Sequence, residues 1–255
     1  MAMLNTREEI AQWLDKYVVK NYEILEDLTV NVEGIVLLTG IDLIGELPVR
    51  FGIVGGDFFC GINELTSLIG CPRIVGGNFS CHDNNLTSLE GCPVEVGECF
   101  YCDGNKLLSL SGCPMVVHAV FNCSDNMLAS LLGCPISVGD SFLCNKNKLL
   151  SLEGCPATIS CDFNCSENLL SNLVGGPSVV EIGFDCSENR LLSLDGLPIS
   201  VGADFNCHGN DLLDSNLIDL PYSQVVLYLK NKSLQLSLES SEAKLPKKVI
   251  LGKKI

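Results

Sequence analysis

Residues 79–93 read FSCHDNNLTSLEGCP, and the chain returns to this pattern every 21 residues. The register is marked by a phenylalanine that recurs at that interval: Phe58, Phe79, Phe100, Phe121, Phe142, Phe163, Phe184 and Phe205. A cysteine stands two residues after each Phe, an asparagine five after it and a leucine seven after it. Self-similarity at a fixed period indicates a repeat architecture, in which stacked coils share a core that no single coil can form.

Each position of the 21-residue unit has a physical role. In the F-x-C step, Phe and Cys point to the same side of a short strand and are predicted to enter the core. The Asn follows where the chain turns, and its amide can hydrogen-bond the backbone of its own and the neighbouring coil. Two Leu fill the core from a return arc, and G-C-P bends the chain back. The sequence therefore predicts a β-rich repeat solenoid.

This pattern resembles the leucine-rich-repeat family, in which Leu occupies the positions of Phe58, Cys60 and their equivalents in the motif L-x-L-x-x-N-x-L. The 21-residue length is similar to the short bacterial type of type III secreted effectors. The stretches 58–72 and 79–93 are closer still to the Cys-rich repeats F-x-C-x-x-N-x-L-T-S-L-x-G-C-P of tailed-phage and bacterial proteins. The resemblance covers roughly residues 34–221. It implies a curved solenoid with a parallel sheet on its concave side and irregular return arcs. The proteins of this group have no single shared activity, so the resemblance does not imply a particular function.

The ends depart from the repeat, as capping units do. We expect an N-terminal helical cap over residues 1–33, a solenoid of one degenerate and eight regular repeats over 34–221, and a C-terminal strand cap with a basic tail over 222–255. A capping box at Thr6–Glu9 precedes the apolar stripe of the predicted cap helix: Ile10, Trp13, Leu14, Tyr17 and Val18. The alternating stretches 225–229 and 234–238 predict a closing hairpin, and the tail contains Lys244, Lys247, Lys248, Lys253 and Lys254.

The charge and hydropathy of the sequence limit which classes of partner the protein can bind and where in the cell it is expected. The formal charge is -15, and residues 21–221 hold 26 Asp/Glu against 6 Lys/Arg. Direct nucleic-acid binding is disfavoured, because it requires Lys and Arg to neutralise phosphates. The acidic charge permits a basic partner, or simply keeps a hydrophobic chain soluble. No secretory signal is visible, and the most apolar stretch, 34–49, is too short to span a bilayer. We expect a soluble, cytoplasmic protein of a bacterial or phage-infected cell, without membrane binding.

The cysteines and histidines do not form a reaction centre in this pattern. The 15 Cys are odd in number and do not supply the two C-x-x-C motifs that mark a zinc site, so we interpret them as small buried apolar residues rather than disulfides or metal ligands. His82 and His208 hold equivalent positions six coils apart, about 29 Å at about 4.8 Å per coil, and cannot act together. His118 lies on a connecting arc. We therefore predict no metal, no cofactor and no enzymatic activity.

The candidate site is the outer surface of the strands. Residues that flank the strand Phe and Cys point outward, and there a rigid repeat tolerates variation. Phe59, Tyr101, Leu143 and Val120 are apolar where solvent favours polar residues, and such side chains are candidate anchors for a partner. The competing interpretation is that scattered apolar surface residues are ordinary. The predicted partner-binding set is Phe59, Tyr101, Leu143, His82, Asp103, Asn122, Asn164, Asp185 and His208.

The leading functional hypothesis is a non-enzymatic scaffold that binds a protein partner through the concave sheet. The phage-like resemblance adds that such a scaffold sequesters or inhibits a host protein. One alternative is an acidic decoy of nucleic acid that blocks a DNA- or RNA-binding protein, although Asn78, Cys99, Val120 and Ser141 interrupt the acidic series that begins at Asp57. The others are a structural spacer and, least favoured, an enzyme built from the terminal segments.

Overall fold

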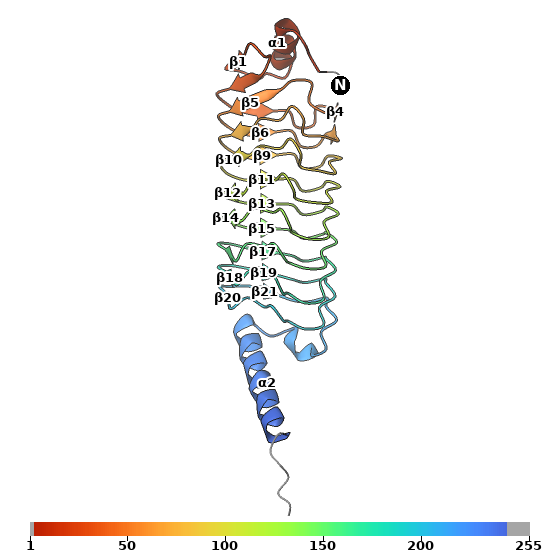
Figure 1. The fold of residues 1–255 in the computed structure, drawn as a ribbon, viewed down its shortest axis with the longest axis vertical. Coiled ribbons are helices and arrows are strands. Elements are labelled where there is room, and N and C mark those ends of the chain that lie inside the picture. Colours follow the sequence, from red (N-terminus) through yellow and green to blue (C-terminus); the bar gives the residue numbers. More distant parts are fainter. Residues whose placement is uncertain (1–2, 244–255) are drawn as a thin grey trace, which may run out of the picture. The chain divides into compact units, whose positions relative to one another are not determined.

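The structure is a computed structural model that describes residues 3–243 (Figure 1). The chain divides into two compact units, Met1–Ile218 and Asp219–Ile255. The first contains helix α1 (Arg7–Lys16), strands β1–β21 and the 3-10 helix η1 (Ser215–Leu217), and the second contains helix α2 (Tyr222–Ala243). Within residues 3–243, no helix combines the length and the hydropathy needed to cross a membrane.

The N-terminal end is a helix followed by a hairpin. Thr6 caps α1 as predicted, because its hydroxyl accepts from the Glu9 amide while the Glu9 carboxylate accepts from the Thr6 amide. Ile10, Trp13 and Leu14 are buried, but the helix ends at Lys16. The predicted stripe is therefore wrong at its last position, since Val18 is exposed at a positive φ of 58° and Val19 is buried instead. The hairpin pairs β1 (Tyr22–Ile24) with β2 (Val30–Val32).

A nine-stranded parallel sheet forms the body of the solenoid. Its pairing stacks equivalent residues, for example Phe100 on Phe121 and Tyr101 on Asn122. The strands are β3 (Val36–Leu37), β6 (Phe58–Phe59), β9 (Phe79–Ser80), β11 (Phe100–Tyr101), β13 (Phe121–Asn122), β15 (Phe142–Leu143), β17 (Phe163–Asn164), β19 (Phe184–Asp185) and β21 (Phe205–Asn206). The Phe rings stack into a column with neighbouring centroids 5.2–6.0 Å apart. The Phe rings from Phe58 to Phe184 and the Cys beside them are buried, which confirms the predicted core, whereas Phe205 at the end of the column is half-buried.

The return arcs carry further short parallel ladders on another side of each coil. These strands are β5 (Phe51–Val54), β8 (Ile74–Val75) and β10 (Glu95–Val96), then β12 (Val116–Val117) and β14 (Ser137–Val138), then β16 (Thr158–Ile159), β18 (Val179–Val180) and β20 (Ser200–Val201), and on a third side β4 (Ile44–Gly45) and β7 (Glu64–Leu65). From β8 onward, each strand of these ladders is two residues long, because the chain turns again directly afterwards.

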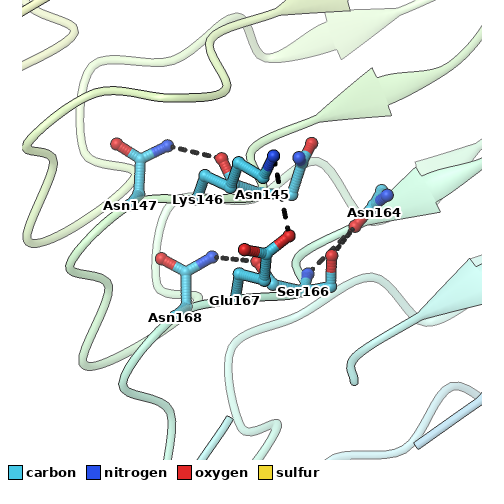
Figure 2. A network of polar contacts seen from close by, with 7 residues as sticks. All are labelled: Asn145, Lys146, Asn147, Asn164, Ser166, Glu167 and Asn168. Carbon is cyan, nitrogen blue, oxygen red and sulfur yellow. Dashed lines mark hydrogen bonds and ion pairs between the residues drawn. The ribbon is translucent and has the colours of Figure 1, made fainter. Parts of the chain in front are cut away.

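The repeated asparagine forms the ladder that the sequence predicts. Asn126 is buried, and its Nδ2 donates to the carbonyls of Cys102, Cys123 and Ser124 at 3.1–3.2 Å. Its Oδ1 accepts from the Leu107 amide of the preceding coil at 2.9 Å. The same bonds recur at Asn147 and Asn168, whose amides are seen turned back onto their own loops in Figure 2. Each rung therefore satisfies backbone groups of two coils at once.

The residue before each Asn is in the left-handed region, which the sequence pattern did not reveal. This position is Ile62, Asp83, Gly104, Asp125, Lys146, Glu167, Glu188 and Gly209, with φ between 49° and 67°. The left-handed conformation costs an L-residue about 1–2 kcal/mol and is least tolerated by β-branched side chains.

Ile62→Gly is expected to raise the free energy of unfolding by about 1 kcal/mol, because Ile62 has φ 53° and is 54% exposed, so little packing is lost. Chemical denaturation measures the change, with Lys146→Gly as the matched variant without β-branching and a smaller expected gain. A loss of stability in Ile62→Gly would show that its packing outweighs the backbone strain.

The C-terminal unit differs from the prediction. The stretches 225–229 and 234–238 were predicted as two strands, but both lie in the single helix α2. Pro221 precedes the helix and accepts from the amides of Gln224 and Val225. Leu, Lys, Gln and Glu within the segment favour a helix, which satisfies its own backbone groups, whereas a lone hairpin is marginal in water. The predicted basic tail, Lys244 to Lys254, lies outside the described residues.

Candidate functional site

The outward side chains of the nine-stranded sheet form a surface that we call the strand face. It comprises the residues one before, one after and three after each strand Phe, since the Phe and Cys themselves turn into the core. Three of its serine side chains are nevertheless buried: Ser80, Ser166 and Ser187. The three apolar candidates, Phe59, Tyr101 and Leu143, are half-buried on this face. In the strand register, Ser80 lies between Phe59 and Tyr101, and Asn122 between Tyr101 and Leu143.

This spacing means that the structure does not bring the three apolar candidates into one cluster. Each lies two coils from the next, about 9.6 Å at about 4.8 Å per coil. They lie on alternate strands of the face, and Val120, directly before Phe121, is a further half-buried apolar residue in the coil between Tyr101 and Leu143. A partner that contacts all three must extend along the solenoid.

The two histidines of the predicted set lie far apart, as expected from the repeat. His82 is half-buried, and its Nδ1 lies 2.6 Å from the Ser80 hydroxyl. His208 is exposed in the last coil. Asp103 is half-buried, and burial raises the pKa of its carboxyl. The side-chain hydrogen bond between Tyr101 and Cys99, with burial, raises the pKa of Tyr101 to about 12. Tyr101 is therefore a neutral phenol at physiological pH.

The remaining polar candidates also hold their own turns. The Oδ1 atoms of Asn122 and Asn164 accept from the amides of Ser124 and Ser166 at 3.0 Å, and from their hydroxyls at 2.6 and 2.7 Å. Figure 2 shows this arrangement at Asn164. Asp185 accepts from the Ser187 amide at 2.9 Å. These side chains are thus fixed in orientation before any partner arrives.

The C-terminal half of the strand face contains a shallow acidic depression of about 360 Å³. Leu143, Asn164 and Asp185 of the predicted set line it together. Asp162 and Asp204 also line it, although they were not in that set. Their signal was present in the sequence, because both immediately precede a strand Phe, but only the fold shows that they line the same depression as Asp185.

A second depression, about 650 Å³, lies away from the strand face over β8, β10 and β12. Its lining includes Val94, Met115, Val116 and His118, and the apolar side chains among these are exposed. Sequence reasoning missed it, because the residue after each G-C-P varies between charged and apolar: Arg73, Val94, Met115, Ile136 and Ala157.

The cysteines are thiols, and most are buried. Burial raises the pKa of Cys102 well above its ordinary value. Cys161 lies nearer the surface, where its hydrogen bond to the Asp140 carboxylate raises its pKa to about 11. Thiolate, the reactive form, is therefore suppressed in the core and at Cys161. Within the described residues, no group of three or more His, Cys, Asp or Glu is placed to hold a metal ion.

Asp140→Asn is expected to lower the pKa of Cys161 toward that of an ordinary thiol, because the variant removes the negative charge and leaves only a neutral, weaker acceptor for the thiol. At mildly alkaline pH, the rate at which Cys161 is alkylated in the folded protein should rise at least about tenfold. Peptide mass mapping of samples taken over time measures this rate. Cys102 serves as the internal control and should stay unmodified. An unchanged Cys161 rate would contradict the role of Asp140.

The stacked coils, Phe column and Asn ladder define a leucine-rich-repeat-like solenoid. Among solved structures, the chain is similar to YopM from Yersinia enterocolitica WA-314, with a TM-score of 0.50 and 18% sequence identity over 75% of this chain. The match covers 52% of that chain, so this protein spans about half its length. The likeness shows the fold. No family model and no curated protein matches the sequence.

Proposed function

We propose that the protein is a non-enzymatic scaffold that binds a protein partner through its strand face. The observation that carries this proposal is the composition of that face. Apolar rungs at Phe59, Tyr101 and Leu143 recur at two-coil intervals, and the outward positions include five Asp but no Lys or Arg. A partner that matches it presents apolar groups together with Lys or Arg. The pre-fixed Asn and Asp side chains lower the entropic cost of binding.

The spacing of the rungs favours a helical segment of the partner. Two coils span about 9.6 Å, and residues i and i+7 of an α-helix are about 10.5 Å apart. A helix that runs along the solenoid can therefore place one side of itself against all three rungs. Basic residues on its flanks then lie near the acidic depression of Asp162, Asp185 and Asp204.

The resemblance of the repeats to those of tailed-phage and bacterial proteins supports a biological role for this binding. In the proposed role, the chain sequesters or inhibits a protein of the bacterial cell in which it is present. An acidic decoy of nucleic acid is the second candidate, and the presence of Asp162, Asp185 and Asp204 around one depression favours it locally. The apolar rungs favour the scaffold, since a decoy relies on charge alone.

The test is capture of a partner from a bacterial lysate by the tagged protein, followed by affinity measurement with the purified partner. Phe59→Ala/Tyr101→Ala/Leu143→Ala is expected to weaken binding at least about a hundredfold, because apolar anchors dominate interfaces. The matched control Val94→Ala/Met115→Ala/Ile136→Ala changes three apolar residues away from the strand face and should leave affinity unchanged. If the control variant lost affinity and the strand-face variant did not, the binding site would lie at the second depression instead of on the strand face. Binding that added salt abolishes but the triple variant does not affect would favour the decoy.

A further inference from the structure

A second surface, on the return arc, has a regular alternation over five coils. We call it the arc face and define it by the sixth, eighth and eleventh residues after the strand Phe in the coils that begin at Phe100, Phe121, Phe142, Phe163 and Phe184. The Leu at the seventh and tenth positions are buried, which turns the others outward. Backbone hydrogen bonds such as Lys148 to Leu128 and Leu150 to Ala129 keep successive coils in register.

The alternation has a period of two coils. In the Phe100, Phe142 and Phe184 coils, the sixth residue is basic, the eighth is Leu and the eleventh is polar or acidic: Lys106, Leu108, Ser111; Lys148, Leu150, Glu153; Arg190, Leu192, Asp195. In the Phe121 and Phe163 coils, the sixth is apolar, the eighth small and the eleventh apolar: Met127, Ala129, Leu132; Leu169, Ser171, Val174.

The apolar side chains of this surface are not core residues. Leu108, Leu132, Leu150, Val174 and Leu192 are between 50 and 64% exposed. Each of the five successive coils therefore exposes a large apolar side chain on this surface at the eighth or the eleventh position, and a surface that repeats exposed apolar groups in this way is a candidate contact surface. The surface is also close to neutral within an acidic chain, since it holds three of the six Lys/Arg of residues 21–221.

We propose that the arc face associates with the arc face of a second copy of this chain about a two-fold axis parallel to the solenoid axis. Such an axis places each coil opposite the same coil of the partner and exchanges the sixth and eleventh positions. Lys148 then faces the partner's Glu153, and Arg190 faces the partner's Asp195. Met127 faces the partner's Leu132, and Leu169 faces the partner's Val174.

The eighth position lies near the axis, so Leu150 packs on the partner's Leu150. A two-fold axis perpendicular to the solenoid axis is disfavoured. It would place the sixth-position residues of one copy opposite the sixth-position residues of the other, so that basic side chains would face basic or apolar ones. Five coils at about 4.8 Å give a contact roughly 24 Å long, at the small end of protein interfaces, so the dimer is weak. The surface differs from the strand face, and the inference does not depend on the proposed function.

The full-length chain is measured by sedimentation equilibrium over a concentration series that extends to the millimolar range. A rise in mass from one to two copies is expected. Lys148→Glu alone and Glu153→Lys alone should each weaken association at least about tenfold, because each sets like charges against each other. An equimolar mixture of the two variants should recover the association, because both facing pairs are complementary in the heterodimer. Native mass spectrometry identifies that species.

The mixing experiment distinguishes a Lys148–Glu153 contact between two copies from one within a single copy. Mixing the two variants restores only the contact between copies. Leu150→Asp should abolish association, whereas Ile199→Asp, at a position 81% exposed outside the arc face, should not. Circular dichroism and thermal melting confirm that each variant is folded. A single-copy mass at every concentration, or no recovery on mixing, overturns the proposal. Phe59→Ala/Tyr101→Ala/Leu143→Ala should still dimerise, which separates this test from that of partner binding.

Discussion

Phe121→Ala is expected to lower the free energy of unfolding by about 3–5 kcal/mol, the typical cost of removing a fully buried Phe. The Phe121 side chain is fully buried in the middle of the column, with ring centroids 5.8 Å from Phe100 and 5.2 Å from Phe142. Alanine leaves a cavity that the coils on either side cannot fill, because their own rungs fix their spacing. In a stack where each coil contacts only its neighbours, the loss also uncouples the two halves.

Urea denaturation followed by circular dichroism measures this change. The matched control is Phe205→Ala, since Phe205 is only half-buried in the last regular coil. Its loss should cost clearly less than that of Phe121. A broadened or two-step transition in Phe121→Ala would show the uncoupling directly. Equal effects of the two substitutions would contradict the view that the column acts as one continuous core.

Asn126→Ala is the second substitution with a large expected effect, about 3 kcal/mol or more. The carbonyls of Cys102 and Cys123 each keep a second donor, from Asn105 and Asn147. The Leu107 amide, however, loses the buried oxygen to which it donates. A buried unsatisfied amide alone costs about 1–3 kcal/mol, and the lost Nδ2 bonds and the cavity add to it.

The control for this prediction is the terminal rung. Asn210 makes equivalent bonds to Cys186, Cys207 and the Leu191 amide, but it is only half-buried. Water can replace its partners, so Asn210→Ala should cost less than half as much in the same denaturation experiment. The shape-matched Asn126→Asp replaces donors by acceptors and should be at least as destabilising as Asn126→Ala. A stable Asn126→Asp variant would show that the donor geometry is not required.

The N-terminal helix and the solenoid core could be predicted because their signals are local or periodic. The Thr6–Glu9 capping box depends on residues three apart, and it forms as expected. The Phe, Cys and Leu positions are buried because the same residue recurs above and below them. The left-handed residue before each Asn was missed, because Ile62, Asp83 and Lys146 have no side chain in common.

The C-terminal segment shows the opposite case. Leu234, Leu236 and Leu238 alternate as in a strand, yet they lie in α2. Alternation predicts a strand only where a partner strand is available, and the repeat that supplies partners to the earlier strands has ended by then. At the N-terminal end, Val19 is buried in place of Val18, because the helix ends at Lys16, two residues before the end of the predicted stripe.

The candidate surfaces were only partly predictable. The sequence placed Phe59, Tyr101 and Leu143 on the strand face, because period-two alternation sets which way a strand residue points. It did not reveal that Asp162, Asp185 and Asp204 converge on one depression, or that Val94 and Met115 line another. Convergence depends on how wide each turn is and on what the neighbouring coil leaves uncovered.

By itself, the sequence determined the 21-residue coil, the inward residues and the Asn rungs, because each coil meets a copy of itself and a periodic pattern has one consistent stacking. Only the tertiary structure showed which outward residues lie together on one surface, and that residues 222–243 form a helix instead of a hairpin. Those outcomes depend on contacts between residues whose separation in sequence carries no repeated signal, and on whether a neighbour is present to satisfy the backbone.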